Sequence, residues 1–210
     1  MNKPYIVASK ESKYALIERK SEFVGRVFPI ESESIALEIL AKIKKENYNA
    51  SHNCYAYVIG VNSEIQRSSD DGEPSGTAGL PILDVLRKGG ITNTLIIVTR
   101  FFGGTLLGSG GLIRAYSECA SQTIKSSALS RVLTSKVYLI ETDYSSFERI
   151  RYDLNNNGFI ITNVEYLSKV FIKTTCADNL HDSPEKLVSE STSGTAIITE
   201  IGDMETRSLL

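Results

Sequence analysis

Hydrophobic and polar positions alternate with two periods along the chain, and the period distinguishes strands from helices. In the first 130 residues, two-residue alternation and short apolar runs predict strands at 14–19, 22–30, 54–60 and 93–101. Apolar positions three or four residues apart predict helices at 31–46, 77–86 and 110–126. The first helix begins with glutamates and ends with lysines, as the helix dipole favours.

The last 80 residues alternate more regularly between the two patterns. They predict strands at 132–141, 159–166, 170–176 and 196–201, with helices at 145–157 and 184–192. This βαββαβ order is that of a ferredoxin-like module. We therefore predict an α+β protein with two domains, 1–129 and 130–210, divided after the polar string Lys125-Ser126-Ser127.

Composition narrows the class of protein. With 41% hydrophobic and 23% charged residues, the 210-residue chain can bury a core, which excludes wholesale disorder. A net charge of −2 gives no bulk attraction to nucleic acid, so such binding needs a local basic patch. Three distant cysteines and two histidines argue against a disulfide framework and a structural zinc site. No apolar run approaches the ~20 residues that span a bilayer, and no signal peptide is evident, so we expect a cytoplasmic protein without membrane contact.

An acidic segment at 68–77 is the first candidate for chemistry. Asp70, Asp71 and Glu73 place three carboxylates within four residues, which suits a hard cation such as magnesium or a general base. Ser75 and Thr77 follow where a helix begins, and free N–H groups there favour an anion. A solvated turn is the alternative, because Asp, Gly, Pro and Ser all favour turns.

A glycine-rich loop between the strand at 93–101 and the helix at 110–126 is the second candidate. Loops of this kind hold phosphate on backbone amides, and Arg100 and Arg114 flank this one as a clamp. The loop lacks the Gly-Lys-Ser/Thr of a P-loop and the third glycine of a dinucleotide fingerprint. The alternative is a tight turn that requires positive φ. The candidate anion-binding residues in the loop are Gly103, Gly104, Ser109, Gly110 and Gly111.

His52 and Cys54 form a third candidate. Residues two apart on a strand share a face, so the pair can act as base and nucleophile. A cysteine inside an apolar strand is more often a small core residue, and this alternative remains open.

Together these segments resemble the IMPACT family, which comprises the YigZ-like proteins of bacteria and their eukaryotic relatives. The resemblance covers about residues 14–125. It is carried by KSEF at 20–23, ASHNCYAY at 50–57, DDGEPSGTAG at 70–79, VTRFFGG at 98–104 and LGSGGLIRAY at 107–116.

The resemblance implies both a fold and a role. The implied N-terminal fold is like the second domain of a small-subunit ribosomal protein. The C-terminal domain of the bacterial branch resembles the last domain of elongation factor G. Eukaryotic members restrain an amino-acid-starvation kinase by competing for its activator, which connects the family with translational control.

We therefore expect a translation regulator, rather than an enzyme, that binds RNA or a ribosome-associated protein and no specific DNA sequence. Arg100, Arg114 and the loop would bind phosphate, while Asp70, Asp71 and Glu73 would order the neighbouring segment. The alternative is a small-molecule phosphotransferase or hydrolase that uses the acidic cluster as metal ligand or base. We expect no cofactor, with magnesium as the open alternative, and we expect both segments to meet on one concave face.

Overall fold

The computed structural model describes residues 4–176 and 184–210, and its contacts divide the chain into two compact units. The N-terminal unit contains the described residues from Pro4 to Val132 together with Arg207–Leu210, and the C-terminal unit contains the described residues between Leu133 and Thr206. The elements up to residue 126, all in the N-terminal unit, are β1 (Tyr5–Ala8), β2 (Ser12–Glu18), β3 (Ser21–Pro29), α1 (Glu33–Glu46), β4 (His52–Ile59), β5 (Ile65–Ser69), α2 (Gly79–Lys88), β6 (Thr94–Phe101) and α3 (Ser109–Ser126).

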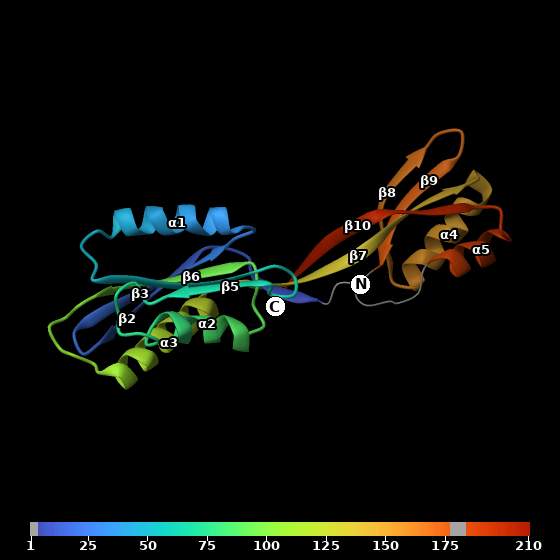
Figure 1. Ribbon diagram of the computed structural model, residues 1–210. Coiled ribbons are helices and arrows are strands. Elements are labelled where there is room, and N and C mark those ends of the chain that lie inside the picture. Colours follow the sequence, from blue (N-terminus) through green and yellow to red (C-terminus); the bar gives the residue numbers. More distant parts are fainter. Residues whose placement is uncertain (1–3, 177–183) are drawn as a thin grey trace. The chain divides into compact units, whose positions relative to one another are not determined.

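The N-terminal unit is built on an antiparallel sheet of order β2-β3-β6-β4-β5. Helix α1 covers one face, and α2 and α3 cover the other (Figure 1). Each face therefore has its own apolar core. The α1 side buries Phe28, Leu40, Tyr57, Leu95 and Ile97, and the other side buries Phe23, Cys54, Ile82, Ile96, Val98 and Tyr116.

The sequence explains this layering. Successive side chains of strand β6 point to opposite faces of the sheet, and the side chains on both faces are mostly apolar. The strand is therefore buried on both faces at the centre of the sheet. Helix α1 begins at the N-cap Ser32, whose Oγ accepts a hydrogen bond from the Ile35 amide at 3.4 Å. The β2–β3 hairpin closes through Arg19 and Lys20, both with positive φ (46° and 67°).

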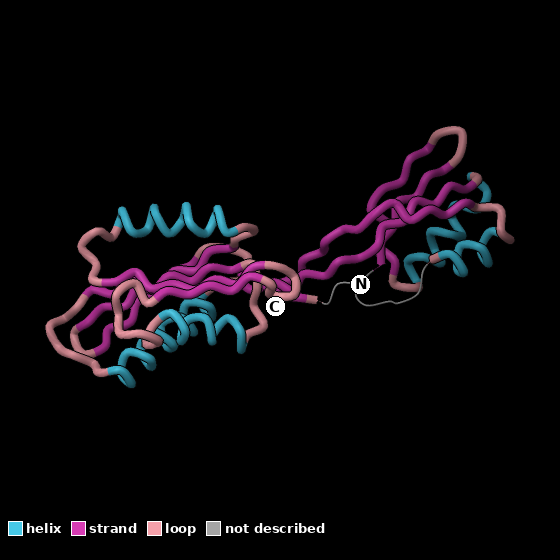
Figure 2. Tube along the Cα trace, viewed as in Figure 1, coloured by secondary structure: helices cyan, strands magenta, loops and turns pink. Residues whose placement is uncertain are grey.

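The C-terminal unit follows the predicted βαββαβ order. Its elements are β7 (Leu129–Thr142), α4 (Tyr144–Asn156), β8 (Phe159–Tyr166), β9 (Val170–Cys176), α5 (Glu185–Thr192) and β10 (Ile197–Leu209). Strand β7 pairs with β9 and with β10, and β9 pairs with β8, all within one sheet (Figure 2). The apolar residues between this sheet and the helices include Ile140, Phe147, Ile150, Leu154 and Ile172. The α+β class predicted from the sequence is confirmed.

The hydrophobic pattern did not predict strands β1 and β5, and it predicted too early an end for strand β10. Strands β1 and β5 have only four and five residues, and β5 (IQRSS) contains a single large apolar side chain. Strand β10 continues to Leu209, well beyond the predicted end at 201, because most of its residues are exposed and carry no apolar alternation. Within the described residues, no helix is long and apolar enough to cross a membrane.

Candidate functional site

Four connecting segments gather at one end of the N-terminal sheet (Figure 1): the turn after β2, the segment before β4, the acidic segment and the glycine-rich loop. Hydrogen bonds join them. Ser51 Oγ accepts from the Phe102 amide at 3.3 Å, and Ser21 Oγ accepts from the Gly103 amide at 3.2 Å. Glu73 in the acidic segment contacts Tyr116 of α3. The acidic segment and the glycine-rich loop therefore lie at the same end of the sheet, the first in contact with α3 and the second with the turn after β2 and the segment before β4.

Beneath these segments lies a buried polar cluster, which we define as Glu73, Arg100, Tyr116 and Cys54. Glu73 Oε1 accepts hydrogen bonds from Arg100 Nη1 and from the Tyr116 hydroxyl, each at 2.7 Å. The side chains of Glu73 and Arg100 are only 2% and 6% exposed. Burial raises the pKa of the Tyr116 hydroxyl, so it stays protonated and donates. Arg100 is thus an internal counter-charge, which corrects its expected role as a surface phosphate clamp.

The other two carboxylates of the acidic segment also bind protein donors. Asp70 accepts hydrogen bonds from the amides of Gly76, Ala78 and Gly79 at 2.8–3.0 Å, so it caps α2. Burial raises the pKa of Asp70, but these three donors outweigh it and hold the pKa below its ordinary value. Asp71 accepts from Lys44 Nζ at 2.6 Å and from the Asn53 amide at 2.7 Å.

These bonds change two sequence interpretations. The expected magnesium alternative loses its ligands, because all three carboxylates are occupied by protein donors in different directions. Among the described residues, no group of three His, Cys, Asp or Glu is arranged to hold a metal ion. The expected anion site at Ser75 and Thr77 also changes, because the Thr77 hydroxyl donates to the Pro74 carbonyl at 2.6 Å and Asp70 accepts from the Ala78 and Gly79 amides where α2 begins. Ser75 is exposed on the same segment.

His52 and Cys54 do not form a base and nucleophile. His52 Nδ1 lies 2.9 Å from the Asp71 carbonyl, and its Nε2 lies 3.9 Å from Glu73 Oε1. The Cys54 thiol contacts the Asp70 carbonyl and the Tyr116 hydroxyl and has no solvent exposure. Burial raises the pKa of Cys54 to about 12, so the reactive thiolate is absent at neutral pH. Cys54 is the core residue of the open alternative.

Different local features explain why glycine occupies each of these positions in the loop. Gly104 and Gly108 have positive φ (83° and 72°), which accounts for them as turn residues. Gly103 packs on the Lys20 carbonyl so closely that a Cβ would collide with it, so packing against the β2–β3 turn accounts for a glycine at this expected anion-binding position. Gly110 has ordinary φ, and apart from its chain neighbours and the backbone of its own helix no described atom lies within 4 Å of where its Cβ would be.

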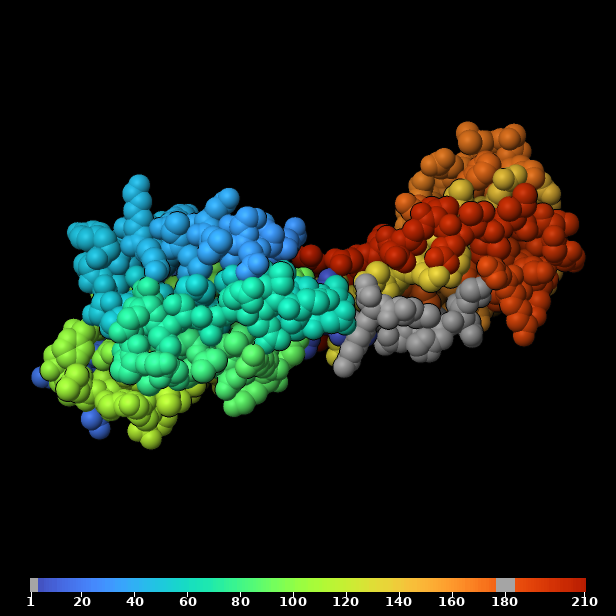
Figure 3. Space-filling model, in the orientation of Figure 1, coloured from blue at the N-terminus to red at the C-terminus, as the bar shows by residue number. Residues whose placement is uncertain are grey.

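Helix α3 therefore begins with an open N-terminus. Its N-cap is Gly108, and no described side chain caps the helix. The first helical hydrogen bond is donated by the Leu112 amide to the Gly108 carbonyl at 2.9 Å. The amides of Ser109, Gly110 and Gly111 come before it and therefore donate no hydrogen bond within the helix. In the space-filling view this loop and the start of α3, coloured yellow-green, lie at the surface (Figure 3).

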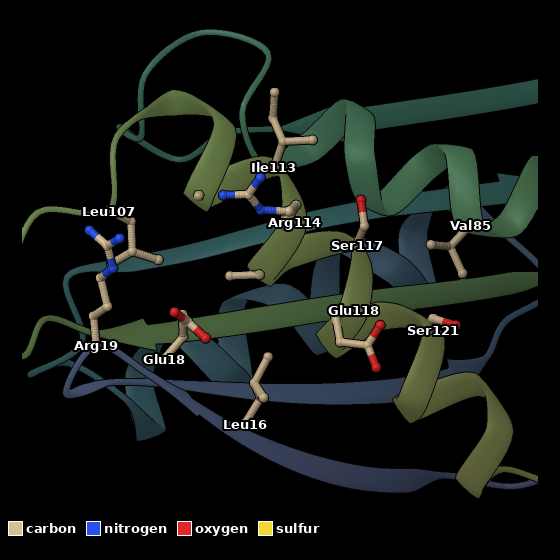
Figure 4. Close-up of a pocket in the computed structure, with 12 residues that line it drawn as sticks. Leu16, Glu18, Arg19, Val85, Leu107, Ile113, Arg114, Ser117, Glu118 and Ser121 are labelled. Carbon is tan, nitrogen blue, oxygen red and sulfur yellow. The ribbon is translucent and has the colours of Figure 1, made fainter.

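A cavity of about 650 Å³ lies beside this helix start. Arg19 from the β2–β3 turn and Arg114 from α3 both lie close to Leu107 in it (Figure 4). Neither arginine forms an ion pair with a carboxylate among the residues that the structure describes. The other lining residues are Leu16, Glu18, Val85, Gly111, Ile113, Ala115, Ser117, Glu118 and Ser121. Asp70, Asp71 and Glu73 are not among them, so the cavity contains only part of the expected site.

The family model described as the Impact N-terminal domain matches residues 19–124, about half of the chain. The chain belongs to the IMPACT family. It is 35% identical to IMPACT family member YvyE of Bacillus subtilis over 93% of this chain and 90% of that protein. It is 31% identical to IMPACT family member YigZ of Escherichia coli over 74% of this chain and 77% of that protein.

A solved structure matches this chain over about the same length as the Bacillus subtilis relative does. A crystal structure described as that of a hypothetical protein has a TM-score of 0.61 and 25% identity, and the match covers 94% of this IMPACT chain and 97% of that chain. Protein IMPACT of Rattus norvegicus is 33% identical, over 44% of this chain and 30% of the rat protein. The buried cluster, the glycine-rich loop and both arginines lie within the region that the family model matches.

Sequence reasoning missed Arg19. The predicted strands 14–19 and 22–30 leave only Lys20 and Ser21 for the turn, so Arg19 was placed in a strand, whereas β2 ends at Glu18 and Arg19 belongs to the turn.

Proposed function

We propose that this IMPACT-family protein is a cytoplasmic regulator of translation that binds RNA at the start of α3. The observation that supports this best is the approach of Arg19 and Arg114, from separate elements, to a helix N-terminus without a side-chain cap. The helix dipole and open amides favour an anion at this position, and guanidinium groups bind phosphate in a directed way.

The hairpin turn supports the same assignment. Arg19 and Lys20 both occupy the left-handed region, where a non-glycine residue costs about 1 kcal/mol or more. Asn-Gly would close this turn with less strain. Keeping two cations in a strained turn is reasonable if their charges serve a ligand, as local strain often does at functional sites.

The distribution of charge also supports an anionic ligand for this part of the chain. Residues 1–132 contain 16 Lys and Arg against 13 Asp and Glu, whereas residues 133–206 contain 6 against 12. The net charge of −2 therefore conceals a cationic first part and an acidic second part. RNA is attracted to the first and repelled by the second.

The phosphotransferase alternative has less support. It needs the carboxylates of Asp70, Asp71 and Glu73 beside the glycine-rich loop as metal ligands or base. Each of these groups is engaged by protein donors, and none lines the cavity at α3. The cavity is lined by Glu18 and Glu118 as well as by the two arginines, and without Asp70, Asp71 and Glu73 it lacks the metal ligands or base that this alternative assigns to them.

Fluorescence anisotropy with a labelled single-stranded oligonucleotide tests the proposal. The logarithm of the affinity should fall with the logarithm of salt concentration, with a slope of about −0.7 for each neutralised phosphate. Arg19→Ala and Arg114→Ala should each weaken binding and make the slope less steep. Arg87→Ala is the matched control, because Arg87 is exposed on α2 and already pairs with Asp84 and Gln66.

Sedimentation of ribosomes with the same variants distinguishes RNA from a protein partner. Ribosome association that depends on Arg114 but is absent for naked RNA would indicate a ribosome-associated protein instead. Failure to bind RNA or ribosomes, or binding that ignores salt, would overturn the proposal.

A further inference from the structure

Phe102 lies at the same end of the sheet, but the proposed phosphate site does not involve it. It directly precedes Gly103 in the glycine-rich loop, and 49% of its surface is exposed. A phenyl ring has no polar group to gain from solvent, so half-exposure leaves a large apolar surface in contact with water. Other exposed apolar side chains near it in sequence are Leu106, which is 80% exposed, and Ile113, which is 42% exposed.

The ring is supported from inside by a fixed cation. The Arg100 guanidinium carbon lies 5.4 Å from the centroid of the Phe102 ring and 5.4 Å from that of Phe23, so the guanidinium contacts both rings. Glu73 fixes this guanidinium at 2.7 Å, and Ser21 Oγ accepts a second hydrogen bond at 3.4 Å. Arg100 Nε has no hydrogen-bond partner among the described residues, so the two aromatic rings are a large part of the surroundings of this guanidinium.

The backbone on both sides of the ring is also fixed. The Phe102 amide donates to Ser51 Oγ, and the Gly103 amide donates to Ser21 Oγ. Gly103 packs directly against the Lys20 carbonyl. The buried Arg100 already occupies the position beneath Phe102, so the ring cannot move inward without displacing a paired charge.

We propose that Phe102 is a stacking platform for an unpaired base of single-stranded RNA, a role that rests on the proposed function. Proteins that bind single strands combine cationic sites for the backbone with aromatic rings for the bases. Here the ring immediately precedes the loop that leads to the anion-binding start of α3. A rigid, preorganised ring stacks on a base without paying the entropy of ordering a free side chain.

The absence of tryptophan from the chain allows a direct test. Phe102→Trp creates a protein with a single Trp, whose fluorescence changes when a base stacks on it. Titration with an oligoadenylate of about 12 nucleotides should quench this fluorescence. Inorganic polyphosphate, which carries charge without bases, should not. Tyr152→Trp is the matched control, because Tyr152 is also exposed (69%) but lies on α4 of the C-terminal unit.

Measurements of oligoadenylate affinity with variants that contain no tryptophan complete the test. Phe102→Leu should weaken oligoadenylate binding about tenfold and leave the salt slope unchanged, because it removes a stacking face and no charge. Phe102→Tyr should bind as the unmodified protein does. The urea unfolding midpoint of each variant verifies that it is folded under the binding conditions.

The outcomes separate the two proposals. If oligoadenylate binds with a salt slope that depends on Arg114, while Phe102→Trp gives no quenching and Phe102→Leu binds normally, the stacking role is wrong and RNA binding stands. If polyphosphate quenches Phe102→Trp as strongly as oligoadenylate, the signal reports charge and the stacking role is also wrong. If the unmodified protein binds neither RNA nor ribosomes, the proposed function fails, and this inference fails with it.

Discussion

Replacing Glu73 by Gln tests whether the Glu73–Arg100 ion pair holds the N-terminal unit together. Glutamine keeps an oxygen that can accept from the Tyr116 hydroxyl, so the change removes charge with little change of shape. The Arg100 side chain, which is only 6% exposed, then remains as a buried cation without a counter-charge. Breaking such a pair from one side costs about 3–5 kcal/mol.

This cost is a large part of the ~5–15 kcal/mol that keeps a typical domain folded. It corresponds to a fall in Tm of roughly 10 °C or more for a unit of this size. Urea unfolding followed by circular dichroism measures the change in free energy.

Two further variants serve as controls. Lys44→Ala removes a partner of the half-exposed Lys44–Asp71 pair and should cost about 0–1 kcal/mol. Glu73→Gln combined with Arg100→Met removes both charges and should recover much of the loss, because a buried pair can be replaced by neutral groups at little cost. If Glu73→Gln alone stays within about 1 kcal/mol of the unmodified protein, the pair is not desolvated and the reasoning is wrong.

Three other predictions follow from the loop and the buried groups. Gly104→Ala should cost about 1–2 kcal/mol because of its positive φ, whereas Gly110→Ala should melt normally but weaken RNA binding by crowding the open amides. Cys54 should resist iodoacetamide at pH 8 until the protein unfolds, as mass spectrometry can verify, and the stability that its raised pKa contributes should fall as pH rises from about 9 towards 12. Asp70→Ala should cost about 2 kcal/mol at pH 7 by uncapping α2. Because the pKa of Asp70 is lowered on folding, this loss should shrink as acid protonates Asp70 in the unmodified protein, as urea unfolding across acid pH can show.

Periodicity predicted the elements that bury at least one continuous apolar face. The helices α1 and α3, the central strands β4 and β6, and the βαββαβ order of the C-terminal unit all have such a face. Strand β5 was missed because it lies at the edge of its sheet, where backbone pairing with β4 rather than apolar burial defines it. Pairing between distant segments leaves no local signal in the sequence.

The candidate site was predicted in part, and the errors have a common cause. Asp70, Asp71 and Glu73 are neighbours in sequence, which suggested a single acidic cluster, but their side chains leave the chain in different directions. Arg100 was assigned to the loop because it adjoins the glycines. Its phase on β6 carries the better signal: Ile96, Val98 and Arg100 alternate on one face, so Arg100 continues a buried row and requires a buried counter-charge.

The buried cluster and the exposed loop are structurally connected, because the first holds the second in place. A buried ion pair adds little net stability compared with apolar packing, so stability alone does not explain Glu73 and Arg100. Their geometry does offer an explanation, because Glu73 connects the acidic segment to β6 and to α3 through two hydrogen bonds of 2.7 Å. Arg100 in turn contacts the Phe102 ring at the start of the loop. The pair thus fixes the segments on which a ligand would bind, and rigid placement of that kind is where buried charges are most useful.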